Sequence, residues 1–197
     1  DIKEAMDNFV QIYNEQLNEE IFIENMDARS KSMMIFEDTI QMAESELDFI
    51  KGMQQAIDVW PNNIDAKLAL IHANAENMPE QLLQSEQLLK EETARWKNET
   101  DQMGWLAFEE RPFFRLKYTI AVDYFEHFMY RHAAAHFNEI LEINESDNLG
   151  ARYYLAAIYV LLAEWEQLDE LYNQFPYSNN EVFLVFILFP AFFLMAY

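Results

Sequence analysis

The fold is decided by a stretch that reads RPFFRLKYTIAVDYFEHFMYRHAAAHF from Arg111 to Phe137. Its pattern returns 35 residues later, where SDNLGARYYLAAIYVLLAEWEQLDELY runs from Ser146 to Tyr172. The basic, small and aromatic landmarks coincide: Lys117 with Arg152, Ala121 with Ala156, Tyr124 with Tyr159, Tyr130 with Trp165, and Phe137 with Tyr172. Self-similarity at this period predicts stacked helix pairs, each of which buries its apolar face against the next.

The composition favours helices along the whole chain. Of 197 residues, 51% are hydrophobic, and only three are glycine and five are proline. Strands joined by tight turns need more of these two residues, whereas Glu, Gln, Leu, Met and Ala favour helices. We therefore predict an all-α fold.

Proline and asparagine divide the N-terminal half into elements. Pro61 cannot continue a helix, and Asn63 can cap the next one by accepting a backbone N–H. The expected helices span residues 2–16, two antiparallel segments within 33–59 that break near Glu44 or Ser45, 63–77, and 80–96 with Pro79 in its first turn. Residues 97–110 are expected to form a polar link.

The C-terminal pattern resembles the tetratricopeptide repeat family, which places a bulky residue, a leucine, a small residue and a tyrosine on the first helix of each pair. A weaker third match includes Met53, Ala56 and Pro61, and a base stands at the usual tryptophan position in all three units: Lys67, Lys117 and Arg152. The phrases at 111–115 and 144–148 resemble bacterial tetratricopeptide proteins similar to the suppressor-of-tumorigenicity family. The resemblance implies a right-handed superhelical solenoid of antiparallel helix pairs that serves as an interaction scaffold.

On this basis four regions are expected. They are an N-terminal helix and connector at 1–32, degenerate helix pairs at 33–110, the two clearest repeats at 111–177, and an apolar terminal helix of a further repeat at 178–197.

The net charge of −22, with only 13 Lys and Arg residues, disfavours nucleic acid as a partner, because such affinity rests on basic side chains. The chain has no cysteine, so disulfides and thiolate metal sites are excluded, and a cytoplasmic location is expected. The acidity itself is interpreted as a solvated surface; mimicry of nucleic acid or attraction of a basic partner are the alternatives.

Motifs for catalysis and metal binding are lacking, so we expect neither enzymatic activity nor a cofactor. His132 and His136 have a spacing that can hold a metal ion, but no third ligand accompanies them, and a solvated pair is expected. His72 and His127 lack the Glu that precedes the His in di-iron bundles. The sequence has no Gly-x-Ser-x-Gly motif and no glycine-rich phosphate loop.

The resemblance implies that a protein or peptide binds in a concave groove lined by the first helix of each pair. The expected groove residues are Arg115, Tyr118, Val122 and Phe125 from one unit, and Tyr153, Ala157 and Val160 from the next. Aromatic side chains beside an arginine are typical of binding hot spots. The alternative is that terminal helices cover these side chains. The Lys and Asn pattern that clamps a peptide's terminal carboxylate in some family members is absent here.

Residues 182–197 contain no charged side chain and include Pro190. This segment is shorter than the roughly 20 residues that cross a bilayer as a helix, so a buried repeat helix is preferred over membrane attachment. Contact between two copies is a further alternative, since an uncovered apolar strip self-associates. Two alternative functions therefore remain. The chain is a structural subunit that self-associates, for example as a homodimer, or it is a membrane-peripheral protein.

Overall fold

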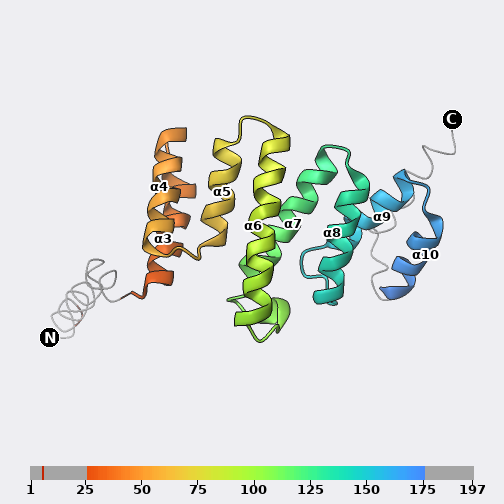
Figure 1. Ribbon diagram of the computed structural model, residues 1–197. Helices are drawn as coiled ribbons and strands as arrows, with labels where there is room; N and C mark the ends of the chain where they lie inside the picture. Colours follow the sequence, from red (N-terminus) through yellow and green to blue (C-terminus); the bar gives the residue numbers. More distant parts are fainter. Residues whose placement is uncertain (1–5, 7–25, 176–197) are drawn as a thin grey trace. The chain divides into compact units, whose positions relative to one another are not determined.

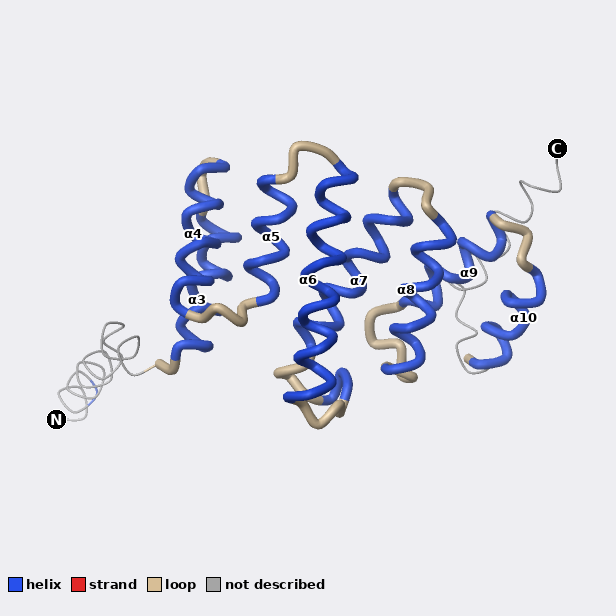
Figure 2. The backbone as a smooth tube through the Cα atoms, viewed as in Figure 1, coloured by secondary structure: helices blue, strands red, loops and turns tan. Residues whose placement is uncertain are grey.

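The computed structural model describes Met6 and residues 26–175, and this part of the chain is all-helical, with no strand (Figures 1 and 2). The all-α prediction is confirmed. The helices are α3 (Ala28–Met42), α4 (Glu46–Val59), α5 (Ile64–Asn74), α6 (Met78–Glu99), the short 3-10 helix η1 (Gly104–Leu106), α7 (Arg111–Glu126), α8 (Tyr130–Ile143), α9 (Ala151–Leu161) and α10 (Trp165–Gln174). The helix expected at 2–16 and the terminal helix expected at 178–197 lie outside the described residues.

The chain forms two compact units, residues 1–74 and 75–197. Their boundary falls inside the region expected at 33–110. The helix α3 begins at Ala28, inside the expected connector at 1–32, because Asp27 caps it: the carboxylate accepts a hydrogen bond from the backbone N–H of Ser30 at 2.8 Å.

In the first unit, buried polar side chains join three helices. The break expected near Glu44 or Ser45 is present, and Ser45 caps α4. Asn63 is buried and accepts the N–H of Ala66 at 3.0 Å, as expected of a cap, while its amide donates to Ser32 Oγ at 2.9 Å. Ser32 in turn donates to the carbonyl of Ala56 at 2.6 Å. The buried side chains of Ser32 and Asn63 are therefore both hydrogen-bonded, which avoids the cost of desolvation without a partner.

Close contact between α3 and α4 depends on Gly52. A Cβ at this position would lie 2.1 Å from Oγ1 of Thr39 on α3. Thr39 cannot turn away freely, because its hydroxyl donates to the carbonyl of Ile35 at 2.6 Å. The glycine therefore lets the two helices approach, and next to it Met53 and Ala56 are fully buried.

In the second unit, α6 packs against α7, α7 against α8, α8 against α9, and α9 against α10. Asn77 caps α6 and Pro79 lies in its first turn, as expected. The helix extends to Glu99, so the polar link expected at 97–110 is shorter and contains η1. Thr100 ends the helix, with its N–H bonded to the carbonyl of Trp96.

The turns after α7 and α9 have the same geometry, 35 residues apart. After α7, Phe128 has a φ of +62° and donates to the carbonyl of Phe125, and Met129 donates to that of Tyr124. After α9, Ala163 has a φ of +55° and donates to the carbonyl of Val160, and Glu164 donates to that of Tyr159. Both are helix-ending turns in which a left-handed residue satisfies the last carbonyls, although neither uses glycine.

The core of the second unit is formed by side chains from α7, α8, α9 and α10. Ala121 and Ala156, the small residues of the two matched stretches, are fully buried, as are Phe137 and Leu155. Small side chains at these positions let neighbouring helices approach, and the aromatic rings fill the remaining space.

Candidate functional site

The seven predicted groove residues lie on α7 and α9. Tyr118, Val122, Phe125 and Tyr153 are half-buried and pack against the core of the second unit. The side chains of Arg115 and Ala157 are half-buried as well.

Val160 is a correction to the predicted site. It is fully buried, as is Ile158, and the Tyr159 between them is 7% exposed. A side chain without accessible surface cannot contact a partner, so Val160 contributes to the core and not to a groove.

The aromatic residues of α7 form one connected cluster with rings from α8 and α9. The Tyr118 ring lies edge-on to Phe137, with centroids 5.7 Å apart, and edge-on to Tyr154 at 5.9 Å. Phe125 meets Tyr154 at 5.1 Å in the same geometry, and Tyr154 stacks on Phe137 at 4.8 Å. Such pairs add roughly 0.5–1.5 kcal/mol each beyond the area they bury. The cluster therefore fixes the orientation of Tyr118 and Phe125.

Tyr154 is the central ring of this cluster, and the sequence reasoning missed it. The groove expected from the sequence contains its neighbour Tyr153 instead. The signal was present, since Ala151, Tyr154, Leu155 and Ile158 follow the three- and four-residue spacing of one helix face.

Tyr118 is half-buried, and Tyr154 is its hydrogen-bonding neighbour. Burial, together with the nearby Tyr154, raises the pKa of Tyr118 to about 12. The phenol therefore stays protonated at neutral pH and acts as a hydrogen-bonding group, not as a base.

A cation–aromatic layer lies beside the cluster at the start of α9. The Arg152 guanidinium lies 4.7 Å from the centroid of the Tyr153 ring and 5.0 Å from that of Phe175, and it donates to the Tyr153 hydroxyl at 2.9 Å. The buried carboxylate of Asp147 caps the helix by accepting the N–H of Ala151 at 2.6 Å and pairs with Arg152 at 3.4 Å. Burial raises the pKa of Asp147 even though these hydrogen bonds oppose the shift.

The basic residue at the matched position of α7 is also held within the unit. Lys117 is buried, and its ammonium group pairs with Glu139 of α8. The bases at these two matched positions therefore both make contacts within the second unit.

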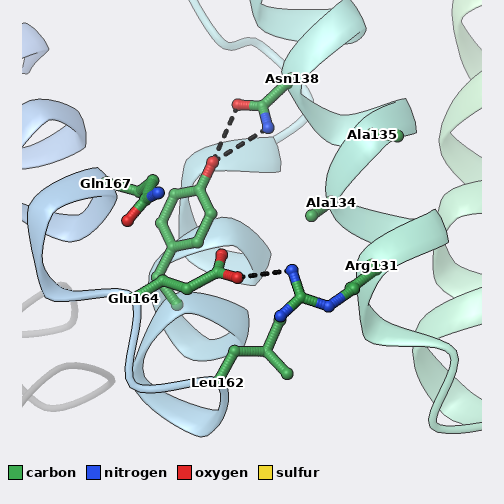
Figure 3. Close-up of a pocket in the computed structure, with 8 residues that line it drawn as sticks. Arg131, Ala134, Ala135, Asn138, Leu162, Glu164 and Gln167 are labelled. Atoms are coloured by element: carbon green, nitrogen blue, oxygen red, sulfur yellow. Dashed lines mark hydrogen bonds and ion pairs between the residues drawn. The ribbon is translucent and has the colours of Figure 1, made fainter.

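A pocket of about 240 Å³ opens between α8, α9 and the start of α10 (Figure 3). The Asn138 side chain exchanges two hydrogen bonds with the Tyr159 hydroxyl, at 2.9 and 3.1 Å, and Arg131 pairs with Glu164 at 2.7 Å. These polar groups bind one another across the pocket. The arrangement ties α8 to α9 and α10.

The histidine pair is a second correction. His132 is exposed, but His136 is largely buried and its Nε2 lies 2.8 Å from a carboxylate oxygen of Glu86 on α6. Both imidazoles stack on Tyr124, whose hydroxyl donates to the same Glu86 oxygen at 3.0 Å. The His136 contact lowers the pKa of Glu86, and burial raises the pKa of Tyr124 to about 12. Sequence spacing could not reveal this pairing, because Glu86 lies on another helix.

Two features of the described residues bear on other functions. Within Met6 and 26–175, no group of three or more His, Cys, Asp or Glu side chains could hold a metal ion. No helix in that same part is long and apolar enough to cross a membrane.

Comparison with protein families, with curated proteins and with solved structures gave no match to this chain.

Proposed function

We propose that this chain is a non-catalytic protein-interaction scaffold of tetratricopeptide type. In this proposal an extended protein segment binds along α7 and α9 against Arg115, Tyr118, Val122, Phe125, Tyr153 and Ala157. The observation that carries it is the half-buried aromatic cluster, whose rings are ordered before any partner arrives.

Pre-ordering matters because immobilising a side chain during binding costs about 0.5–1.5 kcal/mol. Tyr118 and Phe125 have already lost this freedom by packing on Tyr154. Tyr153 is held by the Arg152 guanidinium. A partner that covers these rings gains apolar contact without ordering them, which is the condition under which aromatic residues become hot spots.

The proposal includes a right-handed superhelical stack of helix pairs and a cytoplasmic location. The recurrence of turn geometry at a spacing of 35 residues supports the stacking, and the absence of cysteine supports the location. The alternatives of self-association and membrane attachment depend on residues 182–197, which lie outside the described part.

The proposal is tested by comparing Tyr153→Ala with Tyr172→Ala as baits in lysate of the source cells. Both replace a tyrosine by alanine, but Tyr172 lies on α10 and is exposed. We expect Tyr153→Ala to weaken retention of a specific protein by roughly thirtyfold, as for a hot-spot side chain. Equal retention by both folded variants would refute the groove.

A further inference from the structure

The connection between α6 and α7 exposes three large apolar side chains. Leu106 is 78% exposed, Phe108 is 70% exposed and Met103 is 59% exposed, all within six residues of sequence. Scattered single exposed apolar residues need no explanation, but a group of them on one short segment marks an interaction site.

The backbone of this segment is held by hydrogen bonds to the side chain of Glu110. Glu110 is buried and accepts three hydrogen bonds, from the Trp96 indole at 2.6 Å and from the backbone N–H groups of Met103 and Gly104 at 3.0 and 3.1 Å. Its carboxylate thus fixes the start of the connection to the end of α6. The exposed side chains are presented by a fixed backbone.

The other side of the connection is fixed by Arg111. Its guanidinium lies 3.9 Å from the centroid of the Phe108 ring and 5.1 Å from that of Trp105, and its Nε donates to the Trp105 carbonyl at 3.0 Å. One face of Phe108 is therefore occupied by a cation of the chain itself. Leu106 remains the most exposed apolar group.

A pocket of about 200 Å³ adjoins this segment. Its apolar wall is formed by Trp96, Phe113 and Ile143, and Glu142 lines it as well. Gly104 of the connection lies close to Ile143 of the pocket wall, because a Cβ at Gly104 would be 3.1 Å from the carbonyl oxygen of Ile143. The apolar segment and the pocket therefore belong to the same end of the second unit.

The surroundings are acidic. Five exposed carboxylates lie on the connection or beside it, at Glu99, Asp101, Glu109, Glu142 and Glu145. Two bases lie at this end: the exposed Lys97, and Arg111, which lies over Phe108. Lys97 and Lys117 both line the pocket, and Lys117 is paired with Glu139. An approaching group that carries positive charge is favoured here, and one that carries negative charge is repelled.

We propose that Met103, Leu106, Phe108 and the adjoining pocket form a second docking surface, which binds a protein segment bearing Lys or Arg beside large apolar side chains. The stem of one basic side chain packs on Trp96 and Phe113 in the pocket, and its charge meets Glu142. The apolar side chains of the segment cover Leu106 and Phe108.

The charge of the chain argues against the other occupants of an apolar surface. A second copy carries the same net charge of −22 and brings the same acids to the contact. An anionic membrane surface is repelled by the same carboxylates. A protein segment with basic and large apolar side chains complements both the carboxylates and the exposed apolar groups.

The test begins with selection of short random peptides displayed on phage against the full chain. We expect the selected peptides to combine Lys or Arg with Leu, Phe or Trp. Their affinities are then measured for Leu106→Ser and for Leu83→Ser, a matched control on α6 with 71% exposure. Leu106→Ser should weaken binding at least roughly tenfold, and Leu83→Ser should change it less than about twofold.

A second pair of variants tests the charge. Glu142→Gln should weaken the same peptides roughly three- to tenfold, whereas Glu170→Gln, an exposed residue of α10, should leave them unchanged. Failure to select any peptide, selection of acidic peptides, or equal binding to Leu106→Ser would each overturn the proposal. So would Leu106-dependent self-association in light scattering, or Leu106-dependent binding to phosphatidylserine vesicles. Tyr153→Ala should leave these peptides bound, which separates this surface from the proposed groove.

Discussion

The two glycine-free turns after α7 and α9 make a quantitative prediction about stability. A left-handed conformation costs an L-residue roughly 1–2 kcal/mol relative to its normal region, and glycine does not pay this cost. Glycine loses more backbone entropy on folding, which offsets roughly 0.5–1 kcal/mol. At Ala163, where φ is +55° and the side chain is exposed, Ala163→Gly should therefore stabilise the chain by about 0.5–1 kcal/mol.

The matched residue after α7 should gain less. Phe128 has a φ of +62° and is 77% exposed, but its ring meets that of Tyr130 edge-on at 6.2 Å. Phe128→Gly removes this contact, which is worth about 0.5–1 kcal/mol. The gain and the loss nearly cancel, so a change within about 0.5 kcal/mol is expected.

Replacing a left-handed glycine by alanine should have the opposite effect on stability, and this provides a control. Gly150 precedes α9 with a φ of +76°, and a Cβ there would lie 3.2 Å from the Tyr153 ring. Gly150→Ala should destabilise the chain by about 1–2 kcal/mol, because the left-handed cost and the close contact act together.

These three variants are compared by urea unfolding followed by the far-ultraviolet helix signal. If the free energy of unfolding depends equally steeply on urea in all variants, the urea concentration at the midpoint reports stability. This midpoint should rise for Ala163→Gly, stay nearly constant for Phe128→Gly and fall for Gly150→Ala. A lower midpoint for Ala163→Gly would refute the assigned left-handed turn.

Three further predictions concern the cores and one contact between a carboxylate and a histidine. Phe137→Ala should cost about 3–5 kcal/mol in the same unfolding assay, because the ring is fully buried; a loss below about 1 kcal/mol would contradict the described packing. Gly52→Ala should cost about 1–3 kcal/mol through overlap with Thr39, and adding Thr39→Ala should recover part of the loss; no recovery would exclude the overlap as the cause. The pKa of Glu86 is lowered from 4.5 by His136, so the pair stabilises the fold above that pH and the contribution is lost as the pH falls through the folded-state pKa. Glu86→Gln should therefore destabilise the chain at neutral pH, and this effect should shrink as the pH falls below 4.5 and through the folded-state pKa of Glu86. A pH-independent effect would show that the carboxylate charge is not involved.

Local chemistry made much of the helical pattern predictable. The caps Asn63 and Ser45 and the first-turn Pro79 act on backbone groups a few residues away, so their effects can be inferred from the sequence alone. The sequence predicts that this helix ends at residue 96, whereas α6 continues to Glu99. The residues after Trp96 form a polar, exposed last turn, which composition cannot distinguish from a link.

Features that depend on packing between helices could not be predicted in the same way. The turn at Ala163 lacks the glycine that normally marks a left-handed residue. The choice of Tyr153 over Tyr154 as the inner residue required the rotation of α9 about its axis, which neighbouring helices determine. The pairing of His136 with Glu86 joins residues 50 positions apart. These contacts arise from tertiary structure, for which one sequence carries no direct signal.

Photochemical crosslinking from Tyr153 can detect a partner that is bound on α7 and α9. A photoreactive phenylalanine analogue at this position preserves the aromatic ring, and the same analogue at Tyr172 on α10 provides the control. In source cells we expect one protein to crosslink to position 153 and not to position 172. Crosslinking of the same proteins from both positions, or of none from position 153, would contradict a binding surface on α7 and α9.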